Sequence, residues 1–181
     1  MIEEYPRTSL VAEEWSLNPV ITSYWQRGRK NLDGYSSCLT SPMDFPLQAA
    51  LVAAGLDRNE IYVTNAVKHF KWQLRGKRRL HKTPAQREID ACHQWLEREI
   101  QTVQPQVIVA MGATAARAVI GKDFKVSMMR GQYIESPLAP HVFATFHPSA
   151  LLRLRDEAEK EAAFEQLVQD FRLIGKALGR P

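Results

Sequence analysis

From about residue 47 onward, the apolar and polar positions predict a regular series of strands and helices. Short apolar runs at 61–64, 106–111 and 142–146 are typical of buried strands in a parallel sheet. Segments with helical patterns lie around them, at 47–54, 84–103, 113–120 and 156–178. This order predicts an α/β fold, a three-layer α/β/α sandwich with a mainly parallel central sheet.

The first 46 residues lack this periodicity. Prolines interrupt them, and aromatic residues are scattered among charges. The pattern therefore predicts a divergent N-terminal segment, 1–46, for which poor order is one expectation, and one domain over 47–181. The sheet is expected either to lack its first strand or to use residues 20–25 in that place.

Residues 68–82 are predicted to form a polar loop, which holds seven Lys or Arg residues and no acid. Like charges packed this densely repel one another, so a polyanion is the natural partner. The alternative is a basic loop with no special purpose. Phe70 and Trp72 could stack on bases. Thr83 is the predicted N-cap of the next helix, with Pro84 in its first turn. The predicted phosphate contacts are Lys68, Lys71, Lys77, Arg78, Arg79 and Lys82.

Three predicted strands are each followed by a residue that suits ligand binding: Asn65, Gly112 and His147. Parallel sheets bind ligands beyond the carboxyl ends of their strands, so these residues are expected on one rim. An amide can donate one hydrogen bond and accept another, which matches the O4 and N3–H edge of uracil and not that of cytosine. The alternatives are a strand-end turn at Asn65 and an ordinary strand–helix junction at Gly112.

The segment that follows the last predicted strand combines a histidine with apolar residues and a cation. His147 at a strand end can donate to an anionic leaving group. Leu151 and Leu152 lie next to Arg153 in a predicted exposed loop, which suits insertion into a base stack. Alternatively, both leucines begin to cover the sheet.

Length, charge and cysteine content indicate which kind of partner and which cell compartment to expect. The chain has 181 residues, which suits one domain with a sizeable core, and a net charge of +4 weakly favours a polyanionic partner. No apolar run approaches the ~18 residues of a membrane span. The acidic N-terminus lacks a secretory pattern, and two cysteines make no disulfide framework, so a reducing cytoplasm is expected.

Four stretches together resemble the family 4 uracil-DNA glycosylases, most closely the UdgX type. They are 62–71, 77–84, 107–116 and 147–153, with Arg130–Gly131 as a further short match, and the resemblance covers residues 47–178. The basic segment that ends in His81-Lys82-Thr83-Pro84 is what separates UdgX from ordinary family 4 members.

The resemblance implies a base excision DNA repair enzyme that binds uracil-containing, single-stranded DNA and flips out a deoxyuridine. Asn65 would read the uracil edge, and His147 would stabilise the departing uracil anion. In ordinary members water captures the sugar, whereas in the UdgX type a histidine matching His81 does so and stays joined to DNA. Arg79 and Lys82 would favour neutral His81. The resemblance also places Gly112 and Ser149 at the substrate, and Arg130, Leu151, Leu152 and Arg153 at the DNA. Nothing in the sequence demands an oligomer, so a monomer is expected.

The sequence also departs from this family. A Gly-Glu-x-Pro-Gly motif after the first strand is absent, as is the Pro-Phe-Val-Gly segment that follows it. A shifted reading frame or an altered start is one hypothesis for this. Of the four cysteines that hold the family's 4Fe–4S cluster, only Cys92 has a match, so the cluster is expected to be absent and Cys92 to be a buried, inert thiol. A hydrolytic family 4 enzyme and an inactive DNA-binding remnant remain alternatives.

Overall fold

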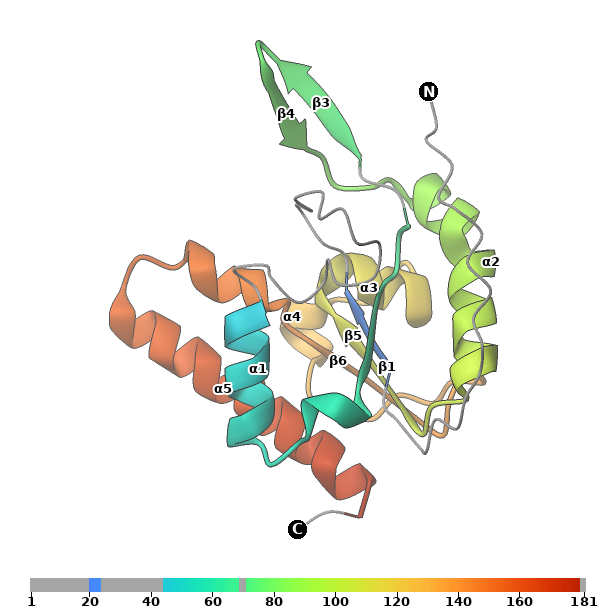
Figure 1. Cartoon of the computed structure of the whole chain (residues 1–181), viewed down its shortest axis with the longest axis vertical. Coiled ribbons are helices and arrows are strands. Elements are labelled where there is room, and N and C mark those ends of the chain that lie inside the picture. Colours follow the sequence, from blue (N-terminus) through green and yellow to red (C-terminus); the bar gives the residue numbers. More distant parts are fainter. Residues whose placement is uncertain (1–19, 24–43, 69–70, 180–181) are drawn as a thin grey trace.

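Strands and helices alternate along the chain, as the pattern predicts (Figure 1). The computed structural model describes residues 20–23, 44–68 and 71–179. Two of its elements, labelled η, are 3-10 helices. In chain order the elements are β1 (Val20–Ser23), α1 (Asp44–Ala53), η1 (Arg58–Glu60), β2 (Tyr62–Asn65), β3 (Trp72–Arg75), β4 (Arg78–His81), α2 (Gln86–Val103), β5 (Val107–Met111), α3 (Gly112–Val119), α4 (Val126–Met129), β6 (His141–Thr145), η2 (Pro148–Arg153) and α5 (Glu157–Ala177).

The central sheet is parallel and has the strand order β2-β1-β5-β6. β1 lies between β2 and β5, with Val20 opposite both Tyr62 and Ile108. The expectation of a sheet without its first strand is therefore wrong, and the alternative strand within 20–25 is confirmed over Val20–Ser23. It also follows that the N-terminal segment contributes to the domain, so residue 46 is not its boundary.

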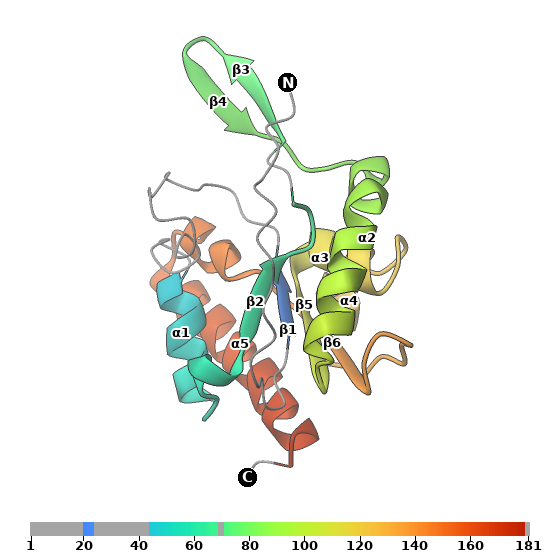
Figure 2. The same ribbon diagram turned by 45° about the vertical axis from the view of Figure 1, so that its right-hand side comes forward.

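Helices cover both faces of this sheet, which makes the fold the three-layer α/β/α sandwich that was predicted. α1 and α5 lie on one side, whereas α2 and α3 lie on the other (Figure 2). β5 faces both layers: Ile108 and Ala110 pack with α2 and α3, and its odd-numbered residues pack with α1 and α5. All five residues of β5 are buried, which explains its continuous apolar run.

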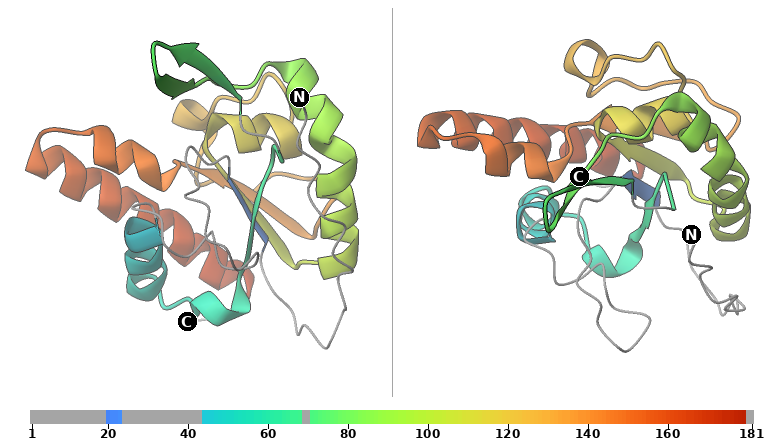
Figure 3. Two further views of the ribbon diagram at one scale, coloured as in Figure 1. Left: turned by 45° about the horizontal axis from the view of Figure 1, so that its top comes forward. Right: turned by 90° about the horizontal axis from the view of Figure 1, so that it is seen from above.

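The two longest helices begin at side-chain caps. The Asp156 carboxylate accepts a hydrogen bond from the Glu159 amide and caps α5. α2 begins after Ala85, whose amide donates to the Glu88 carboxylate at 2.6 Å. Thr83, the predicted cap of α2, therefore lies two residues before the actual N-cap. α5 then runs alongside η2 and α1 (Figure 3).

Residues 72–81 form an antiparallel hairpin instead of the predicted loop. Trp72 pairs with His81 and Arg75 pairs with Arg78, so the strands are joined by a two-residue turn. Gly76 in that turn has φ +60, a conformation that hairpin turns require and glycine adopts readily. The hairpin extends away from the layered body (Figures 1 and 2).

The described helices do not include one with the length and apolar character needed to cross a membrane.

We expect the core side of α5 to contribute much of the stability of the fold. Leu167 is fully buried, whereas Leu173 on the same helix is 39% exposed. Leu167→Ala should lower the free energy of unfolding by about 2–5 kcal/mol, because it leaves a cavity, and Leu173→Ala should cost under about 1 kcal/mol. Urea denaturation measures both. Equal losses in the two variants would contradict this packing.

Candidate active site

The residues predicted at the strand ends lie on one edge of the sheet. Asn65 ends β2, Gly112 begins α3 directly after β5, and His147 follows β6 by two positions. Since the four strands are parallel, their carboxyl ends share this edge. The chain passes from β1 to β2 on one side and later to β5 on the other, so the topological switch point, where such folds bind ligands, lies between β1 and β5.

Gly112 and His147 are in close contact because β5 and β6 are neighbours. Gly112 has φ +84, and a Cβ placed on it would lie 3.0 Å from the Cβ of His147. A larger residue would therefore be strained in its backbone and would also push His147 out of position. Gly112 therefore allows the backbone turn between β5 and α3 and also leaves room for the His147 side chain.

The imidazole of His147 is held in one orientation by the next turn of chain. His147 is the N-cap of η2, and its Nδ1 accepts a hydrogen bond from the Ser149 amide at 3.2 Å. The Ser149 hydroxyl lies 2.8 Å from the same nitrogen. Because Nδ1 accepts, the proton of the neutral ring is assigned to Nε2. Nε2 is buried and has no hydrogen-bond partner among the described residues.

Burial, together with the smaller effect of the nearby charge of Arg153, lowers the pKa of His147 to about 4. Removing the imidazolium from water costs free energy, so the neutral ring is favoured. The structure thus presents a neutral N–H donor at the carboxyl edge of the sheet, fixed before any substrate binds. Such a donor can stabilise developing negative charge.

The basic hairpin is joined to the body by ion pairs with α2. The Lys68 ammonium donates to Glu99 at 2.5 Å and to the Thr64 hydroxyl at 2.9 Å. The Lys71 ammonium lies 2.7 Å from Glu88. The hydrogen bond from Lys71, followed by that from the Ala85 amide, lowers the pKa of the Glu88 carboxyl.

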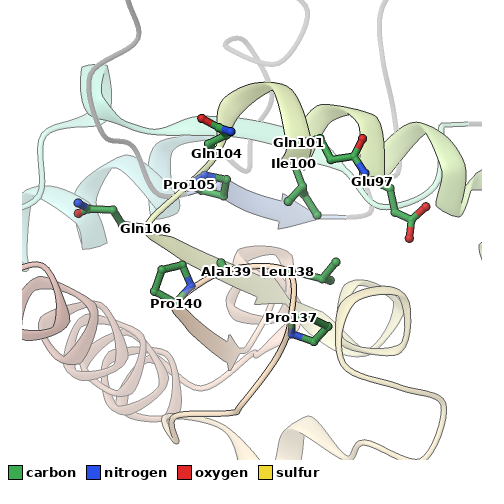
Figure 4. A pocket seen from close by; sticks show the side chains of 10 residues that line it. All are labelled: Glu97, Ile100, Gln101, Gln104, Pro105, Gln106, Pro137, Leu138, Ala139 and Pro140. Carbon is green, nitrogen blue, oxygen red and sulfur yellow. The ribbon is translucent and has the colours of Figure 1, made fainter.

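An open hollow of about 520 Å³ lies at the opposite end of the sheet (Figure 4). Its walls come from the end of α2, the residues before β5 and the prolines before β6. Glu97 is its one charged lining residue, and that carboxylate is already 3.2 Å from the His93 imidazole. The hollow has no part in the arrangement around His147.

The family of the chain follows from its likeness to known proteins. A model of the uracil DNA glycosylase superfamily matches residues 32–172. The chain is 30% identical over 162 residues to the type-4 uracil-DNA glycosylase of Thermotoga maritima, which covers 89% of this chain and 81% of that protein. This chain belongs to the uracil DNA glycosylase superfamily.

Two further relatives in this superfamily match shorter stretches. The type-4 uracil-DNA glycosylase of Archaeoglobus fulgidus is 28% identical over 144 residues, which are 74% of this chain and 64% of that protein. That of Sulfurisphaera tokodaii is 31% identical over 107 residues, which are 54% and 44% of the two chains.

These matches change the interpretation of the N-terminal segment. The family match begins at residue 32, upstream of the predicted start of the domain. An alignment over 162 residues is longer than the chain after residue 46, so it includes part of 1–46. With β1 in the centre of the sheet, a shifted reading frame is no longer needed to explain this segment. The residues directly after β1, where the absent first motif is expected, lie outside the described ranges.

Several predicted DNA contacts have partners within the structure. Lys68 and Lys71 are paired with α2, and Lys68 is only 20% exposed. Leu151 is 7% exposed and packs in the core with α1 and α5, so the prediction of an exposed wedge is wrong for it. Residues 148–153 form η2 instead of the predicted loop, and this turn leaves Leu152 52% exposed.

Other predicted contacts remain available to a ligand. Lys77, Lys82 and Arg153 are exposed. The side chains of Arg78, Arg79 and His81 lie outside the described part of the structure, so their predicted roles are retained as predictions. Ser149, predicted to touch the substrate, contacts His147, and its substrate role stays a prediction.

Arg130, a predicted DNA contact, has an acidic partner within the structure. Its Nη1 lies 2.6 Å from each carboxylate oxygen of Asp170, and its Nη2 donates to Gln166 at 3.0 Å. The predicted DNA role of Arg130 stays a prediction, and the structure adds a structural role beside it. Arg130 directly follows α4, so its ion pair with Asp170 connects the end of α4 with α5.

The residues do not fit the four-cysteine ligand set of a 4Fe–4S cluster. The sequence has two cysteines, and Cys92, the one within the described ranges, is 2% exposed in the core beside α2 and α3. The described residues also contain no group of three or more His, Cys, Asp or Glu that could hold a metal ion.

Asp170 is the residue that the sequence analysis missed. It is 5% exposed and is the one buried acid among the described residues. The signal was present, because Asp170 lies on the apolar stripe of α5 between Leu167 and Ile174. An acid within such a stripe indicates a buried partner, here Arg130 and Thr145.

The pKa of His147 should make stability depend on pH. The unfolded imidazole, with a pKa near 6.5, binds a proton that the folded ring, with a pKa of about 4, does not. Stability should therefore be fully present above pH 6.5 and decline by about 3 kcal/mol as pH falls to 4, from about 1.4 kcal/mol for each pKa unit. His147→Asn should lose this component, and His93→Asn should keep it. An NMR titration of His147 with a midpoint near 6.5 would contradict the burial of a neutral ring.

Proposed function

We propose that this chain excises uracil from DNA. The observation that supports it most is the buried Nε2–H of His147, a neutral donor at the carboxyl edge of the sheet with no partner among the described residues. The type-4 relatives are named uracil-DNA glycosylases, which agrees with a uracil anion as the group that this donor meets.

In the proposed reaction the bond between C1′ of the deoxyribose and N1 of uracil breaks. Its electron pair leaves with uracil, whose anion carries charge on O2 that Nε2–H of His147 stabilises. The sugar is left as an oxocarbenium ion. The neutral imidazole of His147 already carries the Nε2 proton that it donates, so it needs no further protonation. Its lowered pKa keeps the ring neutral at cellular pH.

Uracil would be selected by Asn65 at the end of β2. Its side-chain amide can donate to O4 and accept from N3–H, whereas cytosine offers the reverse pattern at these positions. Asn65 is half-buried, and it lies on the same sheet edge as His147. We therefore assign base recognition to β2 and stabilisation of the leaving group to β6.

We further propose that His81 captures the sugar, as in the UdgX type. A nitrogen lone pair of the imidazole would form a bond to C1′, and the proton on the other nitrogen would then pass to water. His81 is the last residue of β4 and pairs with Trp72, the first residue of β3. Its position at the base of the hairpin, away from the tip at Gly76, supports this role.

Hydrolysis of the sugar intermediate by water is the second candidate, and the names of the type-4 relatives favour it. An inactive DNA-binding protein is the third, because the first family motif is absent from the sequence. We propose that the chain works without a 4Fe–4S cluster, as a monomer and on single-stranded DNA.

A denaturing gel with uracil-containing single-stranded DNA separates these three candidates. If His81 captures the sugar, wild-type protein should give a shifted protein–DNA band that His81→Ala abolishes. Abasic product that alkali cleaves, without a shifted band, would assign hydrolysis. If the gel shows neither the shifted band nor abasic product, and salt-sensitive DNA binding is retained, excision is rejected and the inactive DNA-binding protein is favoured. A matched duplex in the same assay reports the strand preference.

His147 should dominate the excision step. His147→Ala removes the donor to the uracil anion, so its single-turnover excision rate should fall by about 10²–10³-fold. The control is His93→Ala on the exposed face of α2, which should keep the wild-type rate. Equal rates for His147→Ala and wild type would reject the assigned role.

The exposed charge of the hairpin should contribute to DNA affinity through phosphate contacts. Lys77→Ala should reduce the slope of log K against log salt by about 0.7 for single strands, because one fewer counterion is released. Lys176→Ala, an exposed lysine near the end of α5, is the matched control. A slope that changes equally in both variants would show that the hairpin is not a specific phosphate contact.

A further inference from the structure

We propose that Asp170 of α5 is a positioning residue that fixes the segment carrying His147, through Thr145, Arg130 and Gly131. This inference rests on the proposed function, in which His147 stabilises the uracil anion. Asp170 belongs to none of the sequence motifs that mark the site, and it lies more than twenty positions from His147 along the chain.

The Asp170 carboxylate connects β6 with the segment after α4. Thr145, the last residue of β6, is 1% exposed, and its hydroxyl donates to Asp170 Oδ2 at 2.5 Å. Arg130 donates to both carboxylate oxygens at 2.6 Å. One buried carboxylate therefore accepts directional hydrogen bonds from two parts of the chain that are both next to the candidate site.

Gly131 allows this carboxylate to approach the backbone. A Cβ placed on Gly131 would lie 2.7 Å from Asp170 Oδ1, and its φ of +66 is a conformation that other residues rarely adopt. The Gly131 amide also donates to the Ala144 carbonyl at 3.0 Å. Arg130 and Gly131 thus bring the α4 segment against both β6 and α5.

Three consecutive residues before His147 are each held by this group. The Gly131 amide binds Ala144, the Asp170 carboxylate binds Thr145, and the Arg130 guanidinium lies 4.9 Å from the centre of the Phe146 ring. The next residue is His147, whose ring is then oriented by Ser149. The backbone that delivers the imidazole is therefore restrained on one side by Asp170 and its partners, and on the other by η2.

The hydrogen bonds of Asp170 with Arg130 and Thr145 are better suited to positioning the chain before His147 than to stabilising the fold. A buried ion pair gains little over well-packed apolar residues of similar volume, because both charges lose their hydration. Its hydrogen bonds are directional, however, and apolar packing does not reproduce them. A displacement of about 1 Å at a catalytic group can lower a rate by about 100-fold, so directional restraint has a large effect on excision.

Thr145→Val is the most direct test, because it keeps the shape of a buried side chain and removes only the donor to Asp170. We expect the single-turnover excision rate to fall by about 10–100-fold, with unchanged affinity for uracil-free DNA. Thr145→Ser restores the hydroxyl and should recover most of the rate. A purely structural role predicts instead that any loss follows the fraction of folded protein, and that Thr145→Ser gives no specific rescue.

Gly131→Ala tests the same carboxylate without removing a polar group. Its matched control is Gly55→Ala, because Gly55 has φ +72 but nothing within 4 Å of an added Cβ. Both variants carry the same kind of backbone strain, and only Gly131→Ala should displace Asp170 and slow excision. Glu165→Gln, which breaks the exposed pair with Arg172 on α5, should leave the rate unchanged.

NMR of His147 separates failure of this inference from failure of the proposed function. In Thr145→Val the pKa of His147 should rise from about 4 toward its ordinary value of 6.5, because a loosened segment lets water reach the ring beside Arg153. This readout needs no catalysis. If wild type excises no uracil, the proposed function fails while the titration still tests positioning. Unchanged His147 titration and wild-type excision in Thr145→Val would together overturn the inference.

Discussion

The candidate site depends on backbone hydrogen bonds of β1, which hold the two halves of the sheet together. β1 pairs with β2 on one side and β5 on the other, so among the described strands it is β1 that joins the strand end with Asn65 to those with Gly112 and His147. Each strand is short, and parallel pairing over three to five residues is weak without neighbours on both sides. The strand from the least regular part of the sequence therefore determines how the candidate residues at the ends of β2 and β6 are brought together.

The imidazole of His147 is removed from water and held in one orientation. Burial raises the cost of a charged imidazole, and the packing of Gly112 against its Cβ leaves the ring little freedom. The Ser149 amide then selects the tautomer with the proton on Nε2. A donor prepared in this way needs little reorganisation when negative charge develops on a substrate, which is where preorganised dipoles have their greatest effect.

The lysines of residues 68–82, which include the hairpin, fall into two groups: some are paired with acids and some are exposed. Lys68 and Lys71 at its base are paired with acids of α2, which anchors the hairpin to the body. Lys77 at the turn and Lys82 after β4 remain exposed. Two cations of this basic run thus join the hairpin to the body, and the exposed ones are left for the proposed contact with a polyanion.

Sequence patterns by themselves determined the α/β/α layers, the buried strands and the placement of Asn65, Gly112 and His147 at strand ends, because these follow from local periodicity and from the rule that parallel strands share an edge. They did not determine the position of β1, the hairpin, the burial of Leu151 or the partners of Lys68 and Arg130. Those depend on contacts between residues far apart in the chain, such as Arg130 with Asp170. A cation looks the same in sequence whether an acid or a phosphate will face it, and only the tertiary structure decides which one does.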